Sequence, residues 1–199
     1  MKHLAVKAMI AFTTLTASTA CLASDKGVFL GANGLYGEYD AKDLTINGTN
    51  YTPDNKTIYG GGITAGYNAS KRFALELGLE GITNVDYNTN GNISPSQRVG
   101  FVFADLKPMI QGHNMVGFAR LGAAYLSVET DDDNDTTDNS TSKVRPMVGL
   151  GFGVNTSPEV EIDLSINRIQ DSEEPMDFVM LEFTYHFIQH YNNSGFLTD

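Results

Sequence analysis

The strongest constraint on the fold of this chain is a strict alternation of aliphatic and polar side chains over residues 159–167. A period of two places one set on one face of a β-strand and the other set on the opposite face. Residues 180–187 repeat the pattern with Leu, Phe, Tyr and Phe on one face. Both stretches are therefore predicted to be two-faced β-strands. The aliphatic positions of the first stretch are Val160, Ile162, Leu164 and Ile166.

The two-faced pattern recurs in about eight segments, which are joined alternately by tight turns and by longer polar stretches. The long polar stretches are residues 40–56, 84–97 and 129–143, and we expect them to be loops. Transmembrane β-barrels have strands of roughly ten residues, short turns on one rim and long loops on the other. We therefore predict an all-β fold: a single eight-stranded antiparallel up-and-down transmembrane β-barrel.

A soluble, lipocalin-like barrel of eight strands is the alternative, because it would bury the aliphatic faces inside and leave the acidic residues harmlessly outside. The glycines favour the membrane barrel. Six of them lie on the face opposite the aliphatic residues, where a small barrel has little room for side chains. These six are Gly60, Gly62, Gly66, Gly149, Gly151 and Gly153.

The two ends of the chain are expected to lie outside the barrel. Residues 1–23 have the positive start, apolar run and small-residue cleavage site of a secretory signal peptide. We assign residues 24–188 to an outer-membrane β-barrel domain and residues 189–199 to a short C-terminal tail. Cys21 is the only cysteine and falls in the signal segment. The sequence therefore indicates no disulfide framework and no cysteine-based metal site.

The chain is strongly acidic. Its formal net charge is −11, and removal of Lys2 and Lys7 with the signal segment lowers the charge by two further units. An acidic exported protein is a poor candidate for binding nucleic acid, which is itself a polyanion. We therefore expect no nucleic-acid partner.

Three short motifs give the chain a family resemblance. They are Arg120-Leu-Gly after a tight turn, the run PMVGLGFGVNTSPE at residues 146–159, and Tyr185-His-Phe near the C-terminal end. With these motifs, residues 27–187 resemble the membrane domain of the OmpA-type barrels, within the family of small eight-stranded outer-membrane β-barrels. The resemblance implies a bacterial outer-membrane location. The chain is too short to hold a peptidoglycan-binding domain as well, so we expect none. Asp163 stands where that family tends to place an interior arginine.

Eight charged residues share the predicted interior face. They could line a pore or form a catalytic carboxylate pair, but we favour a structural role as the polar filling of a closed barrel. The acids outnumber the two cations, so each cation is expected to lie close to at least one carboxylate. The eight residues are Glu76, Glu80, Asp105, Lys107, Arg120, Glu161, Asp163 and Glu182.

Four cations fall at the outer ends of the predicted strands. They are candidates for contact with lipopolysaccharide phosphates, because arginine forks suit such groups. Ordinary rim charge is an equally good interpretation. The four cations are Arg98, Lys143, Arg145 and Arg168.

Asp131, Asp133 and Asp135 alternate like the start of a calcium-binding loop. Thr136 replaces the glycine and Ser142 replaces the glutamate that an EF-hand requires, so the segment is not an EF-hand. A solvated loop is the default interpretation, and the three aspartates stay a weak candidate for a divalent cation.

The expected function is that of a non-enzymatic barrel with a packed lumen, which serves as an envelope structural or adhesin-like surface-interaction protein. A host or surface ligand would meet the long loops, since recognition usually sits on loops held by a rigid scaffold. We expect a monomer without cofactors, in contact with outer-membrane lipids and lipopolysaccharide. No histidine has a serine two residues on, so a Ser/His/acid site is not indicated. A narrow porin-like channel, a lipid-modifying outer-membrane enzyme and a soluble periplasmic lipocalin-like binder stay as alternatives.

Overall fold

The computed structural model describes residues 27–46, 49–53, 55–88, 96–112, 114–131, 139–172 and 174–187. The expected signal peptide, Cys21 and the expected tail at residues 189–199 lie outside the described residues. Within the described residues, no helix has the length and apolar character needed to cross a membrane.

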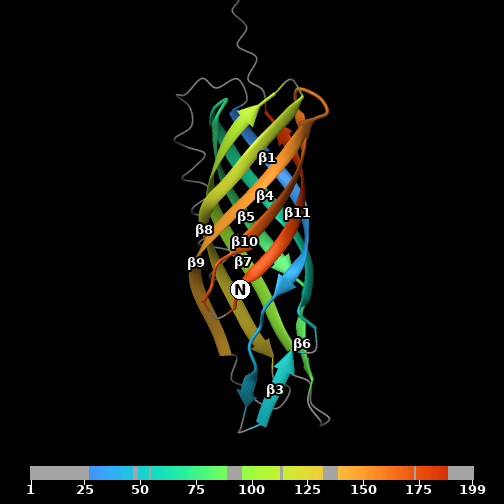
Figure 1. The fold of residues 1–199 in the computed structure, drawn as a ribbon, viewed down its shortest axis with the longest axis vertical. Helices are drawn as coiled ribbons and strands as arrows, with labels where there is room; N and C mark the ends of the chain where they lie inside the picture. The colour runs from blue at the N-terminus through green and yellow to red at the C-terminus, as the bar shows by residue number, and fades with distance from the viewer. Residues whose placement is uncertain are drawn as a thin grey trace, which may run out of the picture.

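Eight antiparallel strands close into a barrel (Figure 1). Each strand pairs with its neighbours in chain order, and the last strand pairs with the first to close the barrel, where Leu35 lies opposite Met180. The predicted all-β, eight-stranded antiparallel barrel is confirmed. Its strands are β1 (Gly27–Tyr39), β4 (Thr57–Ser70), β5 (Phe73–Ile82), β7 (Ser96–Gln111), β8 (Met115–Asp131), β9 (Asn139–Asn155), β10 (Val160–Ile169) and β11 (Met176–His186).

Further strand pairing extends the barrel at its outer end, the end with the long connections. Strands β2 (Leu44–Ile46) and β3 (Thr49–Pro53) form a hairpin, and β6 (Val85–Asn88) joins β3 to β7. Strands β8 and β9 stay paired as far as Thr130 opposite Asn139. The prediction that residues 40–56, 84–97 and 129–143 are loops throughout is therefore wrong. Main-chain pairing does not require alternating aliphatic side chains, so polar segments can remain in the sheet.

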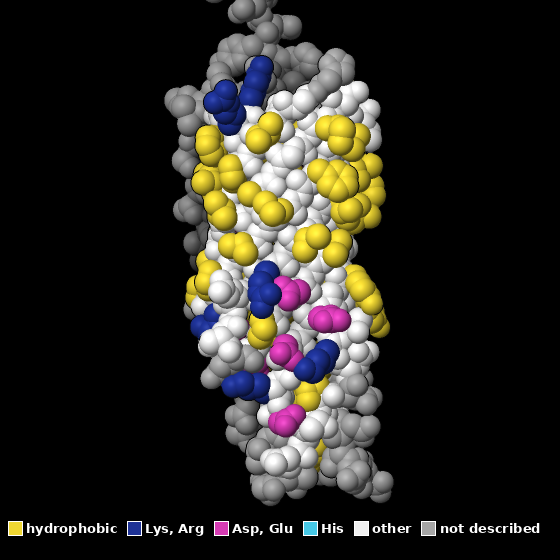
Figure 2. All heavy atoms as spheres, viewed as in Figure 1, with side chains coloured by type: hydrophobic (Ala, Val, Ile, Leu, Met, Phe, Trp, Pro, Cys, Tyr) yellow, Lys and Arg dark blue, Asp and Glu magenta, His cyan; other side chains and the backbone are white. Residues whose placement is uncertain are grey.

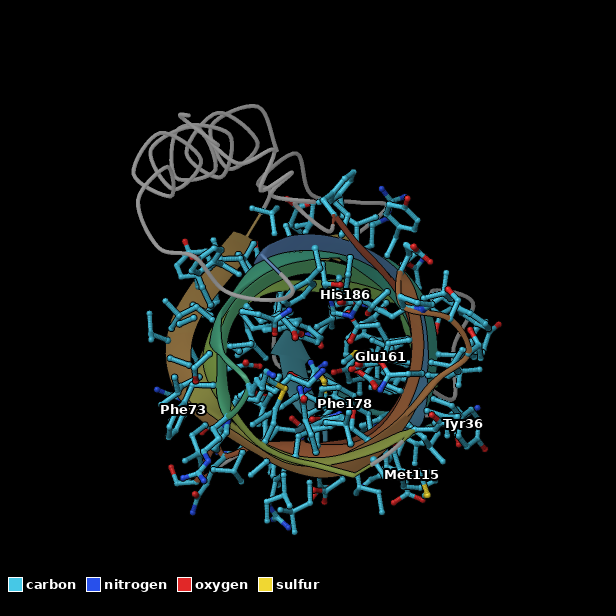
Figure 3. The ribbon with its side chains drawn as sticks, turned by 90° about the horizontal axis from the view of Figure 1, so that it is seen from above. Tyr36, Phe73, Met115, Glu161, Phe178 and His186 are labelled. Atoms are coloured by element: carbon cyan, nitrogen blue, oxygen red, sulfur yellow. The ribbon has the colours of Figure 1, made fainter. Side chains whose placement is uncertain are left out.

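The two faces of the barrel wall divide as the alternation predicts. Along β11, burial alternates residue by residue, with Leu181 and Phe183 exposed on either side of buried Glu182. In the view along the barrel, Tyr36, Phe73 and Met115 point outwards, whereas Glu161, Phe178 and His186 lie inside the ring of strands (Figure 3). This is the opposite of the arrangement in the soluble, lipocalin-like alternative.

An apolar band surrounds the barrel. Ile63, Leu150 and Ile166 are 63%, 70% and 68% exposed, which suits hydrocarbon and not water. Figure 2 shows hydrophobic side chains over the upper and middle parts of one face, and charged side chains gathered below them, towards the outer end. Tyr36 lies opposite Tyr59 on the outward-facing surface. An apolar band with aromatic residues near its edge matches the lipid-facing surface of an outer-membrane barrel.

Leu164→Arg is expected to impair folding into membranes. Leu164 lies midway along β10 on the outward face and is 37% exposed, and arginine near the bilayer midplane costs about 2–4 kcal/mol. Folding into lipid vesicles is measured as the fraction that migrates faster on SDS gels before boiling. Arg168→Gln, on the same face but beyond the aliphatic residues of β10, is the control. Wild-type folding of Leu164→Arg would contradict the assignment of this face to lipid.

Candidate functional site

The barrel interior is divided into three layers along its axis. Strand β7 passes through all of them: Phe101 and Phe103 lie towards the outer end, Asp105 and Lys107 lie in the middle, and Met109 lies towards the inner end. We call these the outer apolar cluster, the ionic layer and the inner apolar cluster. The alternation in the sequence predicts the ionic layer, whereas the two apolar clusters that border it were not predicted.

The outer apolar cluster fills the lumen between the ionic layer and the mouth of the barrel. Its aromatic rings are in contact: Phe101 lies 6.2 Å from Phe103 and 5.7 Å from Phe178, measured between ring centroids. Its other large members are Leu35, Tyr39, Ile58, Val85, Tyr87, Val99, Leu126, Met147, Ile169, Met176 and Met180. The inner apolar cluster is smaller and consists of Phe29, Ala74, Met109, Val116 and Phe118.

The structure places all eight charged residues of the predicted interior face inside the barrel, and each of them is buried. Six are carboxylates and two are cations, so the ionic layer holds more negative than positive groups. The eight side chains come from five strands: Glu76 and Glu80 (β5), Asp105 and Lys107 (β7), Arg120 (β8), Glu161 and Asp163 (β10), and Glu182 (β11).

Arg120 is the centre of the ionic layer and has no exposed surface. Its Nη2 atom lies 2.6 Å from Glu182 Oε2 and 2.9 Å from Glu76 Oε1, and its Nη1 atom lies 3.9 Å from Asp105 Oδ2. Glu182 also accepts a hydrogen bond from the Thr64 hydroxyl. These contacts join β8 to β5, β7 and β11 through one guanidinium group, and the Thr64 hydroxyl on Glu182 adds β4 to the network. Paired charges of this kind are held firmly where solvent is excluded.

Lys107 is the second buried cation. Its Nζ atom donates to Asp163 Oδ2 at 2.5 Å and lies 3.9 Å from both Glu76 Oε2 and Glu161 Oε1. The ammonium group also lies 4.1 Å from the centroid of the Phe118 ring, a favourable cation–π position. Asp163, which stands where the resembling family tends to place an arginine, here provides the closest carboxylate for Lys107.

Glu80 lies at the edge of the ionic layer facing the outer apolar cluster. Its Oε1 atom accepts a hydrogen bond from Asn33 Nδ2 at 2.7 Å. Within the part of the chain that the structure describes, Glu80 takes part in no ion pair, and its Oε2 atom has no hydrogen-bond partner. Glu80 is therefore the buried carboxylate that the two cations neutralise least.

His186 lies inside the barrel near its inner end (Figure 3). Its Nδ1 atom is 3.2 Å from Asn68 Nδ2, and its Nε2 atom is 3.6 Å from Glu161 Oε2. The ring packs against Phe29 with 5.5 Å between centroids. Neither polar partner offers the hydroxyl nucleophile that a Ser/His/acid site needs. His113 falls outside the described residues.

The four rim cations divide into two pairs. Arg98 and Arg168 point outwards, whereas Lys143 and Arg145 lie on the interior face of β9, in phase with buried Met147. All four were predicted to lie at the outer ends of the strands, without a distinction between the two faces. Lys143 Nζ lies 3.3 Å from Glu174, Arg145 Nε lies 2.6 Å from Asp171, and Arg168 Nη1 lies 3.4 Å from Asp177.

The candidate cation site at Asp131, Asp133 and Asp135 lies outside the described side chains. The backbone of Asp131 ends strand β8. Among the described side chains, no group of three or more His, Cys, Asp or Glu residues is placed to hold a metal ion.

Arg120→Ala is expected to lower the free energy of unfolding by about 3–5 kcal/mol, because it leaves Glu76 and Glu182 buried without their closest cation. Glu80→Gln is the matched control, since it removes a buried charge that has no ion-pair partner while keeping an oxygen for Asn33. It is expected to leave stability unchanged or higher. Denaturant unfolding in lipid vesicles measures both. Equal losses in the two variants would contradict a central role for Arg120.

Comparison with known proteins assigns the chain to a family. The family model described as "Outer membrane protein beta-barrel domain" matches residues 8–189. The curated proteins contain no match to the chain.

Solved structures of small outer-membrane barrels share its fold. Ail of Yersinia pestis in complex with the heparin analogue sucrose octasulfate has a TM-score of 0.55 at 15% identity, over 81% of this chain and 99% of Ail. Neisserial surface protein A has a TM-score of 0.58 at 10% identity, over 81% and 97% of the two chains. OprG of Pseudomonas aeruginosa has a TM-score of 0.57 at 14% identity, over 83% and 98%. The chain belongs to the outer-membrane protein β-barrel family and is located in the bacterial outer membrane.

Proposed function

We propose that this protein is a non-enzymatic barrel with a sealed lumen, and that it acts through the strands that extend beyond the membrane at its outer end. The observation that carries the proposal is the filling of the interior. A barrel of eight strands is only wide enough inside for side chains. Here those side chains form an ionic layer between two apolar clusters.

The order of the layers opposes ion flow. An ion entering from outside would first meet the aromatic rings of Phe101, Phe103 and Phe178, which offer no replacement for its hydration shell. Hydrophobic constrictions of this kind exclude ions by excluding water. An ion that passed them would reach carboxylates already paired with Arg120 and Lys107. Both features favour a structural barrel over a narrow channel.

The described interior carboxylates are also not arranged as an acid–base enzyme needs. The two closest carboxylate–cation pairs, Glu182 with Arg120 and Asp163 with Lys107, are buried between the apolar clusters, where a substrate would have to displace packed side chains. Carboxylates used for catalysis must instead come within hydrogen-bond reach of the substrate. We therefore infer that the acids stabilise the barrel and do not perform chemistry.

The outer sheet extension is the proposed interaction surface. Strands β3 and β6 pair with each other and so join two long connections, and recognition usually sits on loops that a scaffold holds in place. Ail, an attachment invasion locus protein of the same fold, has been solved with a heparin analogue. In this chain, residues 129–143 contain six acidic residues and one lysine. Charge therefore favours a neutral or basic partner, such as a host surface protein, over a sulfated polyanion or a nucleic acid.

Lipid contacts complete the proposal. We propose that the outward-facing Arg98 and Arg168 contact lipopolysaccharide phosphates, whereas Lys143 and Arg145 face the mouth of the barrel. Arg168 Nη1 lies 3.4 Å from Asp177 Oδ2, so part of its charge is already paired within the barrel wall. We propose a monomer without cofactors.

Single-channel recording in planar bilayers tests the sealed lumen. We expect no steady conductance from the wild-type protein, and brief small openings from Arg120→Ala, because the acidic layer then loses a cation and admits water. Arg168→Ala, which breaks an exposed ion pair outside the lumen, should behave like the wild type. Porin-sized openings in the wild type would contradict the proposal and favour a channel.

A further inference from the structure

The mouth of the barrel is bordered by walls of unequal height. Strand β9 continues outwards from Met147 to Asn139, whereas its neighbour β10 ends at Ile169, opposite Met147. The connection that follows β10 leads to strand β11, which begins at Met176. The low side of the mouth is therefore spanned by the connection between β10 and β11, of which residues 170–172 and 174–175 are described.

Two ion pairs tie this connection to the tall wall. Arg145 Nε lies 2.6 Å from Asp171 Oδ2, and Lys143 Nζ lies 3.3 Å from Glu174 Oε2. Both cations project from β9 on the face that points into the mouth. About a third of each cation side chain is exposed, whereas Asp171 is nearly buried. Salt can therefore reach these pairs, and screening over a few ångströms at about 1 M would weaken them.

Further bonds fix where the connection lies. Gln170 N donates to Pro146 O at 2.9 Å on the β9 side, and Asp40 N donates to Pro175 O at 3.0 Å on the β1 side. The Tyr39 hydroxyl lies close to the Glu174 carboxylate. Glu174 thus lies between Lys143 of one wall and Tyr39 of the other, above the outer apolar cluster.

The residues beneath these contacts are shielded and apolar. Ile169 and Met176, which flank the connection, have no exposed surface, and Ile58 on β4 has none either. Methionine side chains repack easily around apolar guests because they are unbranched and flexible. The shielded region would accept a small apolar molecule if the connection moved away.

We propose that the Lys143–Glu174 and Arg145–Asp171 pairs form an ionic latch that closes the outer mouth over the outer apolar cluster. Loss of the pairs uncovers the cluster to small apolar molecules from outside. The latch lies outside the ionic layer, so its release does not require that the lumen conduct ions. The proposal is therefore independent of the sealed-lumen function and fails or holds separately.

Cysteine labelling tests the latch. Ile58→Cys places one thiol in the shielded cluster, and Cys21→Ser removes the other cysteine. The rate of reaction with iodoacetamide, a small neutral reagent, is measured on protein that migrates as folded on unheated gels. We expect slow labelling at low salt, and a rise of about fivefold either in 1 M NaCl or with Lys143→Gln plus Arg145→Gln, as for partly exposed pairs. Salt should have no further effect on the latch variant.

Two further variants make the test specific. Arg168→Gln removes an exposed ion pair outside the mouth and should leave labelling slow. Arg145→Asp combined with Asp171→Arg exchanges the two charges. The exchanged pair can still form an ion pair, so labelling should be slow. A labelling rate that responds neither to salt nor to the latch variants would overturn the proposal. The salt response is measured on Ile58→Cys with both ion pairs intact. It therefore tests whether the ion pairs shield the cluster even if the latch variant does not fold.

Discussion

The contact between Arg120 and its carboxylates is the interaction on which the rest of the interior depends. Hydrocarbon surrounds the barrel, so the polar face of every strand must point inwards and find its partners there. Arg120 binds Glu182 and Glu76 from two other strands, and Lys107 repeats this arrangement with Asp163. A buried charge without a partner is costly, so these pairs restrict how the strands can be arranged around the lumen.

Glycines provide the space that this filling needs. A side chain at Gly66 would collide with the ring of Phe29, and one at Gly151 would collide with the ring of Phe118. Both rings belong to the inner apolar cluster, and Phe118 also lies beneath the Lys107 ammonium. The large side chains of some strands thus fit only because glycines, which have no side chain, lie beside them on neighbouring strands. Close packing in a narrow barrel requires this.

Alternation in the sequence predicts much of the fold, because it separates the lipid-facing from the interior residues of each strand. It also places the charges inside, and Phe101, Phe103 and Met180 could have been assigned to the outer apolar cluster because they share the parity of those charges. Which carboxylate meets which cation could not be predicted, because it depends on the stagger of strands distant in sequence. The pairing of β3 with β6 also joins distant segments, and neither segment carries the aliphatic alternation.

The most direct test of this account is a double-mutant cycle between Arg120 and Glu182, with methionine at either or both positions. Reversible unfolding in lipid vesicles gives the coupling free energy of the pair, and Arg168 with Asp177 gives the value for an exposed pair of the same kind. The account predicts a coupling of about 2–3 kcal/mol for the buried pair and under about 1 kcal/mol for the exposed one. Equal, small couplings for both pairs would contradict the claim that the ionic layer holds the barrel together.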